Sequence, residues 1–222
     1  MKKKHKMKNL VSNQDNTNLV VKHENSNYLS LPFFKTHITL SNSSDLERFI
    51  KSIESLIRKS GVYKGYIKYL KEEIGLNRCM VFSELTDKDV TIEMHHSIFT
   101  LFDCVSITLI KFLKENRLIS SFDIAKEVLE DHLNNLIPVA MVSKMVHEAA
   151  HNNINNMDPY FIPLESSWGD IVKYIEKYKG CLTPEHIAKL RKYAIKYNEL
   201  NSDKSEIFKV AMKSFKDMGI VH

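Results

Sequence analysis

The sequence contains no apolar run near the ~20 residues that a membrane-spanning helix needs. Among 222 residues there are only three cysteines, and no two are close in sequence, which excludes a zinc knuckle and a disulfide framework. The six glycines form no phosphate-binding loop. The N-terminal basic stretch has no apolar core behind it, so we expect no secretory signal and a cytoplasmic location. Any metal site must therefore rely on histidine.

The net charge of +5 is unevenly distributed along the chain. Residues 1–8 contain five lysines and no acid, and residues 170–222 carry 11 basic and 7 acidic side chains. Residues 9–169 carry 16 basic and 20 acidic side chains. Basic ends of this kind could follow a phosphate backbone, but a solvated tail and a solvated helix face explain the charge equally well.

Apolar spacing predicts several helices. In the segment 41–60, apolar residues recur at helical spacing after a Ser/Asp cap signal, and Gly61 ends the pattern. Further helices are expected over 63–73, 101–115 and 121–134, and a helix capped by Ser143 is expected to reach about residue 153. The C-terminal part is also expected to be helical, with Pro184 near a helix start.

Two strand-like runs, 78–85 and 90–98, flank a turn-rich tetrapeptide and predict a β-hairpin. The apolar stretch 136–142 is compatible with a strand or a loop. We therefore expect an α+β fold, mostly helical, with a β-hairpin and an adjacent helix. The expected organisation is a flexible basic arm over 1–30, a domain over 31–160 with a helical insertion at about 100–135, and a helical extension over 161–222.

Four histidines form two pairs, and these pairs are the main functional signal. His95 and His96 are adjacent, so on a strand their side chains point to opposite faces. His147 and His151 are four residues apart, so on a helix they share one face. A strand beside this helix could hold a metal ion between His95, His147 and His151. Glu93 precedes His95 by two residues on the same strand face and could orient a metal-bound histidine.

Three protein ligands leave a metal open to water and to a phosphate oxygen, as a catalytic site requires. His96, turned away from the ion, would then act as the general base that deprotonates the attacking water. The predicted cofactor is one divalent ion, with Mg²⁺, Mn²⁺, Ni²⁺ and Zn²⁺ all considered. The remaining histidines, including His132 and His186, are expected to be ordinary polar residues.

The paired histidines and their flanking residues resemble the phage-encoded His-Asn-His (HNH) endonucleases, whose fold is the ββα-metal motif. The similar stretches are HHSIFTLFD at 95–103 and VAMVSKMVHEAAH at 139–151, and the likeness extends over about residues 45–178. The resemblance implies hydrolysis of DNA phosphodiester bonds, with DNA as partner, in the cytoplasm of a bacterial host. It also implies a middle asparagine that orients the base. Asn134 and Asn135 lie a few residues before the expected position, and we assign this role to Asn135.

This sequence departs from the family pattern at two points. Fifty residues separate His96 from His147, and spacing from His147 places the middle asparagine at Pro138 rather than at Asn135. These departures, with the acidic central region, motivate an alternative in which the chain is a non-catalytic phage protein that keeps a decayed nuclease centre.

A second alternative is an HExxH zinc metalloprotease, because HEAAH at 147–151 matches that pattern and would make Glu148 the base. It needs a third ligand after the helix, and Asp158, Glu165 and His186 are not at a recognisable spacing. The metalloprotease alternative also gives no role to His95 and His96.

Overall fold

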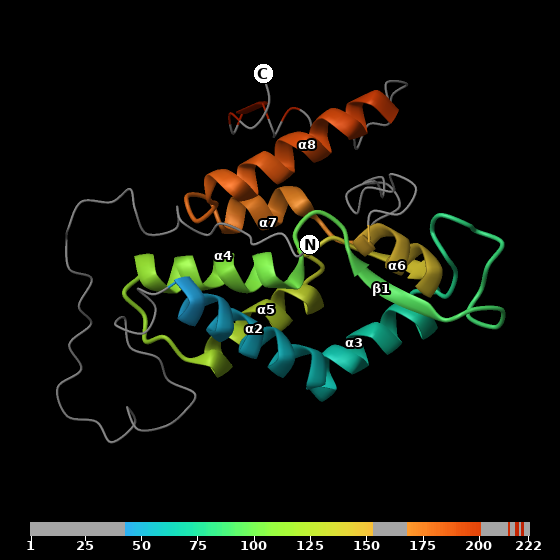
Figure 1. Cartoon of the computed structure of the whole chain (residues 1–222), viewed down its shortest axis with the longest axis horizontal. Coiled ribbons are helices and arrows are strands. Elements are labelled where there is room, and N and C mark those ends of the chain that lie inside the picture. The colour runs from blue at the N-terminus through green and yellow to red at the C-terminus, as the bar shows by residue number, and fades with distance from the viewer. Residues whose placement is uncertain (1–42, 153–167, 201–212, 214–215, 218, 220–222) are drawn as a thin grey trace.

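The computed structural model describes residues 43–152, 168–200, 213, 216–217 and 219. Within these residues there are seven helices and one two-stranded antiparallel sheet, which confirms the predicted α+β, mostly helical class (Figure 1). The predicted arm at 1–30 lies outside the described residues. The elements are α2 (Ser43–Lys59), α3 (Gly61–Glu72), β1 (Ile92–His96), α4 (Leu101–Lys114), α5 (Ser121–Leu133), β2 (Val139–Ser143), α6 (Lys144–Asn152), α7 (Ile171–Lys177) and α8 (Pro184–Leu200).

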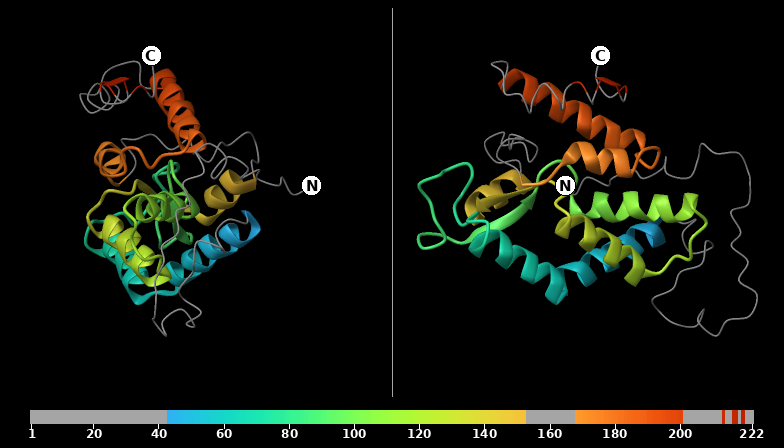
Figure 2. Two further views of the ribbon diagram at one scale, coloured as in Figure 1. Left: turned by 90° about the vertical axis from the view of Figure 1, so that its left-hand side faces the viewer. Right: turned by 180° about the vertical axis from the view of Figure 1, so that it is seen from behind.

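Helices α2, α4 and α5 pack against one another, and the core that they begin extends to residues of the other helices and of both strands. The apolar face of α2 is buried as its spacing predicted, with Ile50, Ile53 and Ile57 inaccessible to solvent. Each such side chain contributes about 1.5–3 kcal/mol when it is buried. Helix α4 is buried around most of its circumference, because α2 and α5 cover it on one side and α7 on another (Figures 1 and 2). None of the described helices combines the length and the apolar character that a membrane span requires.

The sheet differs from the predicted hairpin. Strand β1 pairs with β2, in the register that sets His95 opposite Ala140, and not with the segment 78–85. That segment forms only an isolated bridge between Arg78 and Thr86, and the Met80 amide donates to the Met141 carbonyl at 2.8 Å. All five residues of β2 are buried, and the first four are apolar. A continuous apolar run of this kind is typical of a strand that is covered on both faces. The whole of α4 and α5 lies between the two paired strands in sequence.

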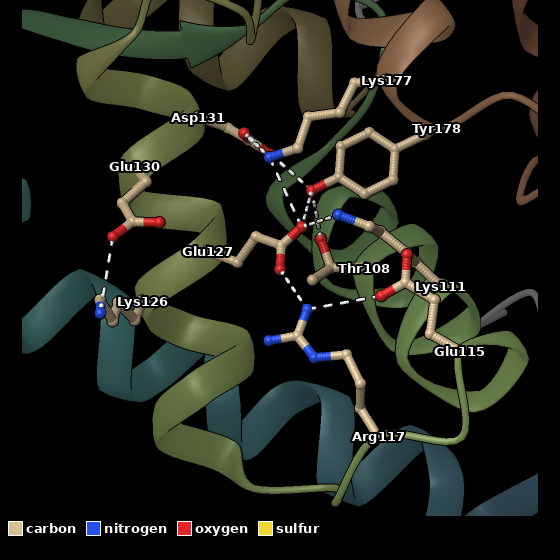
Figure 3. Close-up of polar contacts among 10 residues, drawn as sticks. All are labelled: Thr108, Lys111, Glu115, Arg117, Lys126, Glu127, Glu130, Asp131, Lys177 and Tyr178. Atoms are coloured by element: carbon tan, nitrogen blue, oxygen red, sulfur yellow. Dashed lines mark hydrogen bonds and ion pairs between the residues drawn. The ribbon is translucent and has the colours of Figure 1, made fainter.

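A buried polar cluster attaches α7 to α4 and α5 (Figure 3). Glu127 of α5 accepts from Lys111 of α4 at 2.6 Å and from Arg117 at 3.0 Å. Asp131, one turn further along α5, accepts from Lys177 and from the Tyr178 hydroxyl at the end of α7. The buried carboxylates are thus compensated by cations and a hydroxyl from neighbouring elements, as buried charges require.

Tyr178→Phe is expected to lower the free energy of unfolding by about 1–2 kcal/mol. The hydroxyl lies 2.6 Å from Asp131 Oδ2 and 3.1 Å from Thr108 Oγ1, and its loss leaves that buried carboxylate with fewer donors. Urea unfolding measures the change. Tyr69→Phe is the matched control, because Tyr69 is exposed and its variant should stay within about 0.5 kcal/mol of the wild type. An equal effect of the two substitutions would contradict a special role for the buried hydroxyl.

The N-terminus of α8 rests against the N-terminus of α4. Asp103 closes the capping box of α4 with Thr100, and both of its carboxylate oxygens accept from Lys189 of α8, at 2.6 and 2.7 Å. The buried His186 packs edge-on against Phe99 in the same contact. Asp103 and His186 are therefore held in a packing contact between the two helices.

Candidate metal centre

The antiparallel pair β1–β2 leads directly into α6, and this arrangement positions the candidate site. Ser143, the last residue of β2, has its hydroxyl 3.4 Å from the amide of Val146 and thereby caps the helix. Helix α6 packs on the sheet through Val146 and Ala150, the two buried residues on its inner face. Helix α6 lies beside β1 (Figure 1), and the rings of His147 and His151 are next to that of His95 on the strand.

His95, His147 and His151 are brought together at this junction. One ligating atom from each residue can be chosen such that all three lie within 4.8 Å of one another. The ring centroid of His95 is 5.2 Å from that of His147 and 5.5 Å from that of His151. His95 is buried, His147 is partly exposed and His151 is exposed, so the cluster opens to solvent along α6. The spacing of the two histidine pairs therefore located three side chains that converge in space.

The hydrogen bonds of the cluster determine which nitrogens face one another. The carboxylate oxygen Oε2 of Glu93 lies 2.6 Å from His147 Nδ1, so this nitrogen carries the proton and donates it. His147 Nε2 is left as an acceptor, and His151 Nε2 lies 2.9 Å from it. Partial loss of hydration beside the neighbouring rings lowers the pKa of His151, and the charge of the adjacent His147 imidazole lowers it further. Both effects favour the neutral imidazole, which is the form that ligates metals.

His96 points to the other side of β1, into the helical core. Its Nε2 lies 3.1 Å from His132 Nε2, and its ring is stacked parallel to that of Tyr63. His132 Nδ1 donates to the Val128 carbonyl at 2.7 Å, so in the neutral ring the Nε2 of His132 accepts and His96 Nε2 must donate. Burial first, and the neighbouring His132 second, hold the pKa of His96 well below its usual value. His96 is a buried donor within the core.

Asn135 follows the C-cap residue of α5 and is hydrogen-bonded to a tryptophan. It adopts a left-handed conformation with φ of 53°, which asparagine tolerates better than most residues. Its side-chain oxygen accepts from the Trp168 indole at 2.6 Å, and its carbonyl accepts from the Asp170 amide at 2.8 Å. Neither of these hydrogen bonds involves His96. They build the turn that precedes β2.

Glu148 is exposed on α6 and lies 3.8 Å from Lys144, one helical turn before it. It does not belong to the three-histidine cluster, because adjacent helical residues face different directions. The third histidine of that cluster comes from a strand that precedes the helix, whereas the HExxH pattern takes its third ligand from a segment that follows it.

Two contacts of this region had no recognisable signal in the sequence. His132 is 36 residues from His96, and only the packing of α5 against β1 makes it the partner of that imidazole. Trp168 forms a backbone bridge to Val139 at the edge of β2, although 28 residues lie between them in sequence. Such contacts depend on tertiary structure, and neither residue lies in a motif with characteristic spacing.

A family model described as Bacteriophage G278-like virion protein matches residues 1–218. No curated protein and no solved structure matches the chain. The family match covers nearly the whole chain, including every element described above.

This match overturns the enzymatic interpretation. The resemblance to HNH endonucleases was wrong as a family assignment, and with it the predicted hydrolysis of DNA phosphodiester bonds. The expected cytoplasmic location was wrong too, since a virion protein is part of the phage particle. The physical reason is visible at His96, because the residue expected to activate water is buried and hydrogen-bonded to His132. The non-catalytic phage alternative agrees better with these findings.

Proposed function

We propose a structural, non-catalytic role in the phage particle for this chain, which belongs to the bacteriophage G278-like virion protein family. The observation that carries the proposal is the family match over residues 1–218. The chain contributes a helical body built on α2, α4 and α5, to which α7 is attached by the polar cluster around Glu127 and Asp131.

The geometry of β1 supports the absence of catalysis. A general base must come within about 2.6–3.2 Å of the proton that it removes, directly or through one water. The Nε2 of His96 already lies 3.1 Å from His132 and faces the core, while the three-histidine cluster lies on the opposite face of the strand. Activation of a metal-bound water by His96 would therefore require β1 to be rearranged.

Purified phage particles provide the direct test. We expect peptides of this chain to be recovered from density-purified particles at a constant ratio to the major capsid protein, and to persist after protease treatment of loosely attached material. Peptides that are abundant in the infected cell and missing from the particles would contradict the proposal.

A separate assay tests the absence of nuclease activity. The purified full-length chain, incubated with supercoiled plasmid and Mg²⁺, Mn²⁺, Ni²⁺ or Zn²⁺, is expected to leave the plasmid uncut. His96→Ala is the control, because it distinguishes a contaminating nuclease from this chain. Cutting by the wild type that disappears in His96→Ala would overturn the non-catalytic assignment.

A further inference from the structure

We infer that His95, His147 and His151 bind one divalent transition-metal ion of the zinc class, and that this ion cross-links β1 to α6. The inference rests on the convergence of three imidazoles from a strand and a helix. It does not depend on the role of the chain in the particle, so it can fail or succeed independently of that role.

The nitrogen positions match what such an ion requires. Zinc binds imidazole nitrogen at about 2.0–2.1 Å, and in a tetrahedral site two ligating nitrogens are then about 3.3 Å apart. The Nε2 atoms of His147 and His151 are 2.9 Å apart, and one ligating nitrogen from each of the three histidines lies within 4.8 Å of the others. The imidazole rings of His147 and His151 lie on the open side of the cluster, so their rotation would bring the nitrogens to the separations that an ion requires.

Glu93 acts as a positioning residue for this site. Its carboxylate accepts from His147 Nδ1 at 2.6 Å, which fixes the ring orientation and leaves Nε2 to face the cluster. Carboxylates behind metal-bound histidines commonly have this function. Glu93 and His95 are two residues apart on β1, so one face of the strand provides both a ligand and the support of a second ligand.

The donor set determines the class of the ion. Three imidazole nitrogens suit zinc, nickel, cobalt or copper, whereas Mg²⁺ is bound mainly through oxygen ligands and water. Because His151 is exposed, the remaining coordination position faces solvent and can take water. The site can therefore exchange its ion with solution while the chain stays folded.

The ion would strengthen the attachment of α6 to β1. Helix α6 has nine residues, and only Val146 and Ala150 on it are buried. A helix this short is not stable without tertiary contacts. Bonds from His147 and His151 to an ion shared with His95 would add a direct link between the helix and β1.

Metal titration of the full-length chain tests the inference. After removal of metal with EDTA, Co²⁺ uptake is followed by visible absorption and Zn²⁺ uptake by calorimetry. We expect one ion per chain, and Zn²⁺ at about one hundred times its Kd should raise Tm by about 5–10 °C. Hydrogen exchange should slow in α6 and remain unchanged in α2.

Variants on the exposed side of the site keep the test independent of folding. His151→Ala should weaken Zn²⁺ binding by about 100-fold or more, and Glu93→Gln by about 10–100-fold. Glu148→Gln, a change on the same helix outside the cluster, should bind Zn²⁺ like the wild type. Circular dichroism verifies that each variant is folded.

Three results would overturn the inference. The first is a folded wild type that takes up neither Co²⁺ nor Zn²⁺. The second is uptake that is unchanged in His151→Ala, which would place the ion elsewhere. The third is binding of Mg²⁺ as tight as that of Zn²⁺, because three imidazole nitrogens could not account for it.

Discussion

Gly169→Ala is expected to lower the free energy of unfolding by about 3–5 kcal/mol. Gly169 has φ of +127°, a conformation that residues with a side chain rarely adopt. A Cβ at this position would lie 2.5 Å from the carbonyl oxygen of Ile137 and 2.8 Å from the Cα of Pro138. These are backbone atoms, so the neighbouring chain as a whole would have to shift.

The close approach at Gly169 matters because it lies where three segments meet. The preceding residue, Trp168, exchanges two backbone hydrogen bonds of 2.7 Å with Val139 of β2. The following residue, Asp170, caps α7 and donates its amide to the carbonyl of Asn135. Displacing Gly169 would therefore strain the bridge to β2 and the start of α7 together.

Urea unfolding of the variant gives the loss, and a second glycine provides the control. Gly65 is exposed on α3 with no atom within 4 Å of an added Cβ. Gly65→Ala should raise the free energy of unfolding by about 0.5–1 kcal/mol, because alanine is the better helix former. Equal stability of Gly169→Ala and the wild type would show that the chain tolerates a Cβ there and would refute the packing argument.

The helices could be predicted from the sequence because their signals are local. The apolar positions of α2 recur at 3.6-residue spacing. Helices α4 and α5 are preceded by the N-cap residues Thr100 and Ser120, whose side chains accept from the backbone amide three residues later. The partner of β1 could not be predicted in this way. The true partner, β2, follows after two helices, whereas the strand-like run at 78–85 lies next to β1 in sequence.

In the candidate site, too, the local features could be predicted from the sequence and the tertiary contacts could not. Spacing alone predicted that His147 and His151 share a helix face and that His95 and His96 point apart, and both are observed. Spacing could not predict what lies beyond each face. On one side of β1 are the two helical histidines, and on the other is His132, which makes His96 a core residue.

Acidification from pH 7 to pH 4.5 is expected to lower the free energy of unfolding by about 2–3 kcal/mol through His132 alone. This imidazole is fully buried, and burial lowers its pKa to about 4, against the donation to Val128 that raises it. In the unfolded chain the pKa of histidine is about 6.5. Between these two values the unfolded chain binds a proton that the folded chain does not, so stability falls as the pH falls. The buried His96 shifts in the same direction.

Urea unfolding at several pH values between 7 and 4.5, with EDTA present, measures this loss. Asp131 acts in the opposite sense, because burial raises its pKa and its folded form takes up a proton more readily. Comparison with His132→Gln separates the two contributions. This variant should be less stable than the wild type at pH 7, yet it should lose less stability on acidification, because residue 132 no longer titrates. An identical pH dependence in both proteins would show that the buried imidazole of residue 132 does not limit stability in acid.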